Sequence, residues 1–144
     1  MNTPLQTITD GLTYAGEVKH IIINYLALLI TVAPITMLPA KALKIKQAAY
    51  LVLFIMAVFQ VVLWFVVAAT GISVTWCALS GAIVLIVARY REYRQPLLFV
   101  AIAATLIAII YYALTLPIET TIAHAAAVVL GAGLFWVFAP KRRK

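Results

Sequence analysis

The chain has 144 residues, of which 66% are hydrophobic and 10% are charged, and its formal net charge is +7. A soluble globular domain contains about 45–50% apolar and about 25% charged residues, so this composition excludes that class and predicts an integral membrane protein. The length allows one domain of several spans, and the single cysteine, Cys77, excludes an internal disulfide.

Residues 1–19 are too polar and too short to cross a bilayer, and we expect them to form a short extracytoplasmic segment. Five apolar stretches follow, each near the ~20 residues that cross a ~30 Å hydrocarbon core. They cover 20–38, 48–69, 72–90, 96–115 and 121–139. We therefore predict an all-α membrane protein, with a five-span helical bundle over 20–139 and a basic cytoplasmic tail at 140–144.

Basic residues predict the orientation of this bundle. Ten of the eleven lysines and arginines lie in three clusters, at 41–46, 89–94 and 141–144. These clusters fall on the same side of five spans, so the positive-inside rule places the N-terminus outside and the C-terminus in the cytoplasm. We expect a multi-pass protein of the plasma (inner) membrane. The clusters are best explained as topology signals and contacts to lipid headgroups, and we expect the bilayer, not nucleic acid, as their partner.

Several polar residues fall in the outer half of the predicted membrane region. His20 and Asn24, in "HIIIN", are four residues apart and share one helix face. His124 lies just inside the outer end of the fifth stretch. Ser80 precedes Arg89 by nine residues, roughly 14 Å of helix, which places it above mid-membrane. Because 71–79 contains glycine, serine and threonine, we expect it to be at least partly non-helical, with the helix proper starting near Ser80.

This set of side chains can support acyl-transfer chemistry. A serine next to a histidine can act as a nucleophile with its general base, and an asparagine with a second histidine can stabilise an oxyanion. Each residue also has a structural interpretation. His20 and His124 can be interfacial residues, Asn24 can join two helices, and Ser80 with Gly81 can be small packing residues.

Three segments resemble the rhomboid family of intramembrane serine proteases. "HIIIN" (20–24) is similar to its His-x-x-x-Asn stretch, "ALSGA" (78–82) to its Gly-x-Ser-Gly motif, and "AHAAAVVLG" (123–131) to its last helix. The resemblance implies a Ser80–His124 catalytic dyad and an oxyanion hole made by His20, Asn24 and the backbone N–H of Ser80. It implies cleavage of transmembrane segments of other proteins, with no metal or cofactor.

The sequence departs from the family pattern in several places. The usual first span and the loop after it have no counterpart, so the core is one span short. Ala78 replaces the first glycine of the serine motif, Val84 stands where a tyrosine often stacks on the catalytic histidine, and Ala127 replaces a glycine. The alternative is a non-enzymatic multispan protein: an inactive rhomboid-like binder of a partner helix, or a subunit of a transporter, channel or secretion complex, alone or as an oligomer.

Overall fold

The computed structural model describes residues 3–13, 16–66 and 71–141, and most of these residues lie in helices. The α-helices are α1 (Pro4–Thr13), α2 (Val18–Thr36), α3 (Leu43–Val66), α4 (Ser73–Arg89), α5 (Pro96–Thr115) and α6 (Ile118–Phe138). Two short 3-10 helices, η2 (Ala40–Ala42) and η3 (Arg91–Tyr93), lie between them. These ranges contain no strand, so the predicted all-α class is confirmed.

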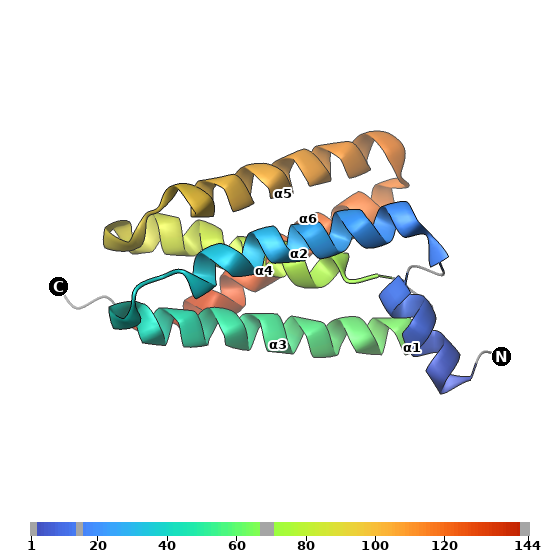
Figure 1. Ribbon diagram of the computed structural model, residues 1–144, viewed down its shortest axis with the longest axis horizontal. Coiled ribbons are helices and arrows are strands. Elements are labelled where there is room, and N and C mark those ends of the chain that lie inside the picture. Colours follow the sequence, from blue (N-terminus) through green and yellow to red (C-terminus); the bar gives the residue numbers. More distant parts are fainter. Residues whose placement is uncertain (1–2, 14–15, 67–70, 142–144) are drawn as a thin grey trace.

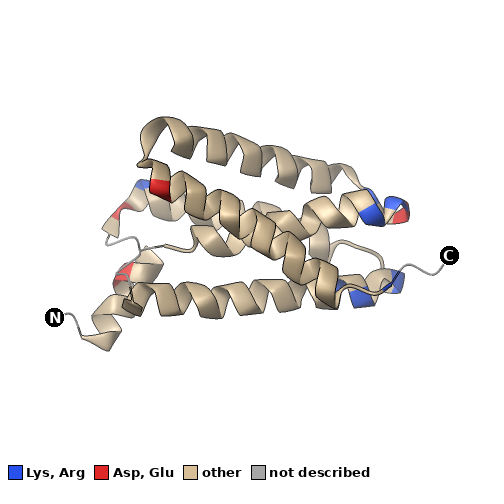
Figure 2. Cartoon of the chain, turned by 180° about the vertical axis from the view of Figure 1, so that it is seen from behind, with Lys and Arg blue, Asp and Glu red and all other residues tan. Residues whose placement is uncertain are grey.

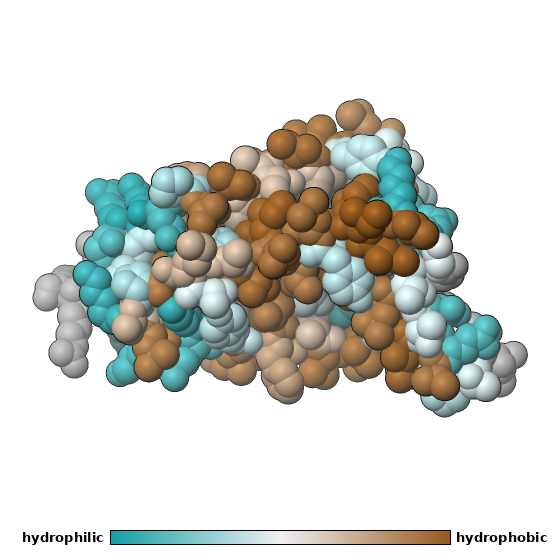
Figure 3. Space-filling model, in the orientation of Figure 1, coloured by the Kyte–Doolittle hydropathy of each residue, from teal (hydrophilic) through white to brown (hydrophobic). Residues whose placement is uncertain are grey.

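Four of these helices, α2, α3, α5 and α6, are long and apolar enough to cross a membrane. Hydrophobic residues fill the middle of the visible face of the bundle, and hydrophilic residues gather at its two ends (Figure 3). Both observations identify a membrane protein. Helix α4 is apolar but has only 17 residues, about 26 Å of helix, slightly less than the ~30 Å core.

Helix α4 is the central element of the bundle (Figure 1). It contacts α2, α3, α5 and α6, and 11 of its 17 residues are buried. Its most extensive contact is with α6, and the two helices run in the same direction. Two glycines bring their backbones together. A Cβ atom on Gly81 would lie 1.9 Å from the Val128 carbonyl oxygen, and one on Gly131 would lie 1.9 Å from the Ala78 carbonyl oxygen.

The expectation that the fourth helix starts near Ser80 is wrong, because α4 already begins at Ser73. Partners from α3 stabilise its first turn. The side-chain oxygen of Gln60 accepts a hydrogen bond from the Val74 backbone N–H at 3.2 Å, which satisfies an amide that has no partner within the helix. Only residues 71 and 72 precede the helix as bends, and Gly71 has a φ of 86°, which glycine adopts at little cost.

The segment expected to lie outside the membrane contains α1, which packs on the end of α3. A Cβ atom on Gly11 would come within 2.3 Å of the Trp64 ring, and the Gly11 carbonyl oxygen accepts a 2.7 Å hydrogen bond from the Gly71 N–H. At the opposite end of the bundle, most lysines and arginines gather near the C-terminus (Figure 2). The two ends therefore differ in charge.

Candidate functional site

Asn24 lies on α2 and points into the bundle, where it is 1% exposed. Its amide nitrogen donates to the His20 carbonyl oxygen at 3.0 Å. Its amide oxygen accepts a 2.9 Å hydrogen bond from the indole N–H of Trp76, on α4. Asn24 therefore joins α2 to the central helix.

His20 does not share this position. Its ring nitrogen Nδ1 is paired with the Glu17 carboxylate one turn earlier on the chain, and its side chain is 33% exposed. The predicted oxyanion pair is thus divided. Asn24 faces the interior, whereas the His20 ring is engaged at the partly exposed end of α2.

Ser80 is buried on α4, and its hydroxyl has partners on two sides. Ser80 Oγ donates to the Trp76 carbonyl oxygen at 3.0 Å and lies 2.6 Å from Thr105 Oγ1, on α5. Thr105 Oγ1 in turn donates to the Ala101 carbonyl oxygen at 2.9 Å. Two hydroxyl protons can satisfy only two of these three contacts at a time, and each acceptor available to the Ser80 proton is one of these partners, so the Ser80 hydroxyl has no unused donor in this arrangement.

His124 is buried on α6, with one ring nitrogen bonded and the other not. Nδ1 lies against the Thr120 carbonyl oxygen, one turn earlier. Since a carbonyl only accepts, Nδ1 carries the proton and Nε2 has the lone pair in the neutral ring. Nε2 is buried and has no hydrogen-bond partner among the described residues.

Tyr112, on α5, covers the His124 ring. The two ring centroids are 4.6 Å apart and the planes are inclined by 42°. Tyr112 is itself buried, beside Trp76, Cys77 and Ala127. The imidazole is therefore held in place by an aromatic contact on its face and a backbone contact at Nδ1.

Ser80 and His124 lie on neighbouring helices but at different levels. Gly81 meets Val128, whereas His124 precedes Val128 by four residues, about 6 Å of helix rise. None of the hydrogen bonds of the described residues joins Ser80 to His124. The hydrogen bond expected between Ser80 and His124 is therefore not formed in this structure. The catalytic roles of both residues stay a prediction.

Sequence reasoning missed two partners of these residues, Thr105 and Tyr112. Both lie on the buried face of α5, together with Leu98 and Ala101. The spacing of this set, three, four and seven residues, is the repeat of a helix face that packs against a neighbour. This spacing in the sequence could have indicated that Thr105 and Tyr112, the two polar residues of the set, face the interior of the bundle.

No metal-binding group is assembled in the described part of the chain, where no three His, Cys, Asp or Glu side chains come together. Asn24, Trp76, Ser80 and Thr105 instead form interior hydrogen bonds between helices, and the His124 ring packs on Tyr112. Comparison with known proteins gives no match, whether with a family model, a curated protein or a solved structure.

Proposed function

We propose that this protein is a rhomboid-like intramembrane serine protease that cleaves transmembrane segments of other membrane proteins. In this proposal α4 is a fifth, central span, the N-terminus lies outside and the basic end faces the cytoplasm of the plasma (inner) membrane. The separation of basic residues at one end of the bundle supports that orientation (Figure 2). The three motif segments of the resemblance supply the reaction type.

One observation carries the proposal, the state of His124. A buried nitrogen without a partner costs free energy, roughly 1–3 kcal/mol, and a catalytic role is one of the explanations for such groups in native proteins. The ring is oriented by Tyr112 and by the Thr120 carbonyl, and its open nitrogen is the basic one. An oriented imidazole with an available lone pair is what a general base requires.

The proposed chemistry needs Ser80 to change partner. Its hydroxyl leaves Thr105 and Trp76, and His124 approaches by about the one turn that separates their levels. His124 Nε2 then takes the Ser80 proton as Oγ attacks the scissile carbonyl carbon. The ring returns that proton to the leaving amine, and water hydrolyses the acyl-enzyme. Catalytic hydrogen bonds are often absent in ligand-free structures and form with substrate, so substrate binding is the step that supplies this rearrangement.

The experiment is covalent labelling in native membranes with a fluorophosphonate probe that reacts with activated serines. We expect labelling of the wild-type chain, and its loss in Ser80→Ala and in His124→Gln. A matched control is Thr36→Ala, which removes an exposed hydroxyl bonded only within its own helix. Wild-type protein that is folded and remains unlabelled, with and without a transmembrane peptide substrate, would refute the protease.

A second candidate function is non-enzymatic, the binding of a partner's membrane-spanning helix without cleavage. The observation that favours it is the Ser80 hydroxyl, which is fully engaged between α4 and α5. Intramembrane serine and threonine side chains commonly serve as such helix–helix contacts. Under this alternative, Ser80 stays unlabelled, and Ser80→Ala leaves association with partner helices unchanged.

A further inference from the structure

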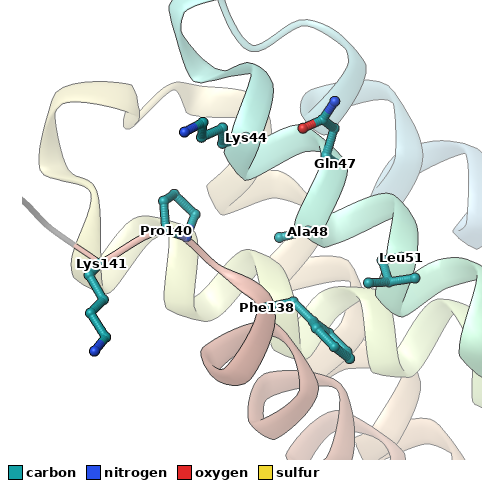
Figure 4. Close-up of a pocket in the computed structure, with 7 residues that line it drawn as sticks. All are labelled: Lys44, Gln47, Ala48, Leu51, Phe138, Pro140 and Lys141. Carbon is teal, nitrogen blue, oxygen red and sulfur yellow. The ribbon is translucent and has the colours of Figure 1, made fainter.

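A cavity opens at the basic end of the bundle, between the start of α3 and the end of α6. Its volume is about 880 Å³. The residues that line it are Lys44, Gln47, Ala48, Leu51, Phe138, Pro140 and Lys141. Figure 4 shows Lys44 and Gln47 near the start of α3, with Leu51 and Phe138 on the other side of Ala48. The cavity is therefore polar and basic at one end and apolar at the other.

The spacing along α3 aligns these two parts with the membrane. Lys44 and Leu51 are seven residues apart, so they share one face of the helix, separated by about 10 Å of rise. Lys44 stands at the first turn of a helix that is long enough to cross the membrane, and Leu51 lies deeper within that helix. Leu51 and Phe138 are 40% and 41% exposed, so neither is covered by the protein.

The wall that carries Lys141 is held in place. The Tyr90 hydroxyl donates a hydrogen bond to the Pro140 carbonyl oxygen. The Tyr90 ring also meets the Phe135 ring edge-on, with centroids 6.5 Å apart. At the next residue of α6, the Arg89 guanidinium lies 4.5 Å from the centre of the Trp136 ring. These contacts attach the end of α6 to the end of α4 and place Lys141 beside the cavity.

A second cavity, about 410 Å³, adjoins the first and shares Lys44, Pro140 and Lys141 with it. It adds Lys41, whose ammonium lies 5.8 Å from the centre of the Tyr93 ring, and one acidic residue, Glu92. Three lysines and one glutamate leave a net positive charge around the joint opening. The larger cavity has two lysines and no acidic residue among its described lining.

We infer that this cavity binds one anionic phospholipid. The phosphate of the headgroup lies between Lys44 and Lys141, Gln47 donates to a headgroup oxygen, and an acyl chain follows Leu51 and Phe138 towards the membrane centre. Lysines at a membrane interface attract anionic headgroups, and basic recesses between membrane helices are suited to bind them. A free phosphate would use the lysines but leave the apolar wall uncovered, so the lipid is the ligand that matches both parts.

The test uses the full chain in detergent micelles, titrated with phosphatidylglycerol or with phosphatidylcholine of the same acyl chains, with bound lipid counted by native mass spectrometry. We expect the wild type to prefer phosphatidylglycerol. Because each lysine near a lipid surface contributes about 1 kcal/mol, the double variant Lys44→Gln with Lys141→Gln should bind it roughly tenfold or more weakly. Phosphatidylcholine binding should change little.

The matched control is Arg91→Gln with Arg94→Gln, which removes the same charge from the same end of the bundle but from residues outside both described linings. It should keep most of the phosphatidylglycerol preference. A third variant, Leu51→Ser, should weaken binding of long-chain lipid several-fold, and inorganic phosphate should not compete. Three results would each overturn the site. They are an equal loss of phosphatidylglycerol binding in both double variants, equal affinity of the wild type for the two lipids, and full competition by inorganic phosphate.

Discussion

Ser80 and His124 are two buried polar residues on neighbouring helices of the same bundle, and their surroundings differ. The Ser80 hydroxyl is 2.6 Å from Thr105 Oγ1 and donates to the Trp76 carbonyl, so all of its hydrogen-bonding capacity as a donor is used. His124 Nε2 is equally enclosed and has no partner within the described residues. Packing and helix association account for Ser80, but they do not account for an open nitrogen on His124.

Of the two residues, His124 is therefore the one whose surroundings need a functional explanation. A buried, bonded hydroxyl contributes modestly to helix association, about 0.6–2 kcal/mol in membranes. A buried group without a partner opposes folding, so the open nitrogen of His124 calls for an explanation that packing does not supply. Variants that remove each group, the glycine contact between α4 and α6, or the neighbouring hydrogen-bond partners test this difference.

The largest expected effect comes from the two residues themselves. If the chain is a hydrolase, Ser80→Ala and His124→Leu should each lower the rate of fluorophosphonate labelling by at least about 10³-fold, and the double variant should be hardly worse, because dyad members act as a unit.

The effects of Ser80→Ala and His124→Leu on the free energy of unfolding should differ. Ser80→Ala should lose about 1 kcal/mol of stability, whereas His124→Leu should be neutral or stabilising, since it removes an unpaired buried group. Thermal unfolding in micelles measures this contrast. An equally destabilised His124→Leu would show that the ring's contacts with Tyr112 and Thr120 outweigh the cost of its unpaired nitrogen.

The contact that sets the relative level of the two residues should give the next largest effect. Gly131→Ala places a methyl group 1.9 Å from the Ala78 carbonyl oxygen, so α4 and α6 must separate. We expect a loss of stability of roughly 1–3 kcal/mol or more from this overpacking. Gly133→Ala is the matched control on the same helix, because a Cβ there meets nothing within 4 Å. It should be neutral or stabilising by up to about 1 kcal/mol, since alanine is the better helix former. Similar melting temperatures for the two variants would contradict the close contact of α4 and α6.

A smaller effect is expected at the interior hydrogen bond between α2 and α4. Trp76→Phe removes the indole donor and leaves the Asn24 amide oxygen unpaired, at a cost of about 1–2 kcal/mol beyond that of the lost ring volume. Combining Trp76→Phe with Asn24→Leu should recover part of that cost, because neither polar group then remains buried alone. A double-mutant cycle on unfolding free energies measures the coupling, and strict additivity of the two changes would mean that the bond contributes nothing.

The sequence was informative about the helices and less so about their contacts. Each predicted apolar stretch contains a helix, because length and hydropathy determine which segments can lie in a bilayer. The start of α4 was missed because glycine, serine and threonine at 71–75 favour turns locally. The partner that allows a helix there is Gln60, from a different helix. Such tertiary contacts are not visible in a local pattern.

The candidate site shows the same limit. His-x-x-x-Asn spacing correctly places His20 and Asn24 one turn apart, but it does not reveal that Glu17 engages one and Trp76 the other. The axial level of His124 relative to Ser80 depends on where Gly81 and Gly131 bring two backbones together. Sequence marks Gly81 as a packing residue without specifying the register of its helix against α6.

The smallest expected effect is at Thr105, and it tests whether Ser80 is held back by its neighbour. Thr105→Val keeps the shape of the side chain but removes the hydroxyl that lies against Ser80 Oγ. Stability should fall by only about 0.5–1.5 kcal/mol, because Ser80 keeps its bond to Trp76. If Ser80 is a nucleophile restrained by this contact, its fluorophosphonate labelling should become a few-fold faster, and Thr105→Ser, which restores a hydroxyl, should return it to the wild-type rate. Slower labelling in Thr105→Val would instead mean that Thr105 orients the serine for reaction. An unlabelled Ser80 in all three proteins, with their folds intact, would leave the hydroxyl pair as a helix–helix contact and favour the non-enzymatic helix binder.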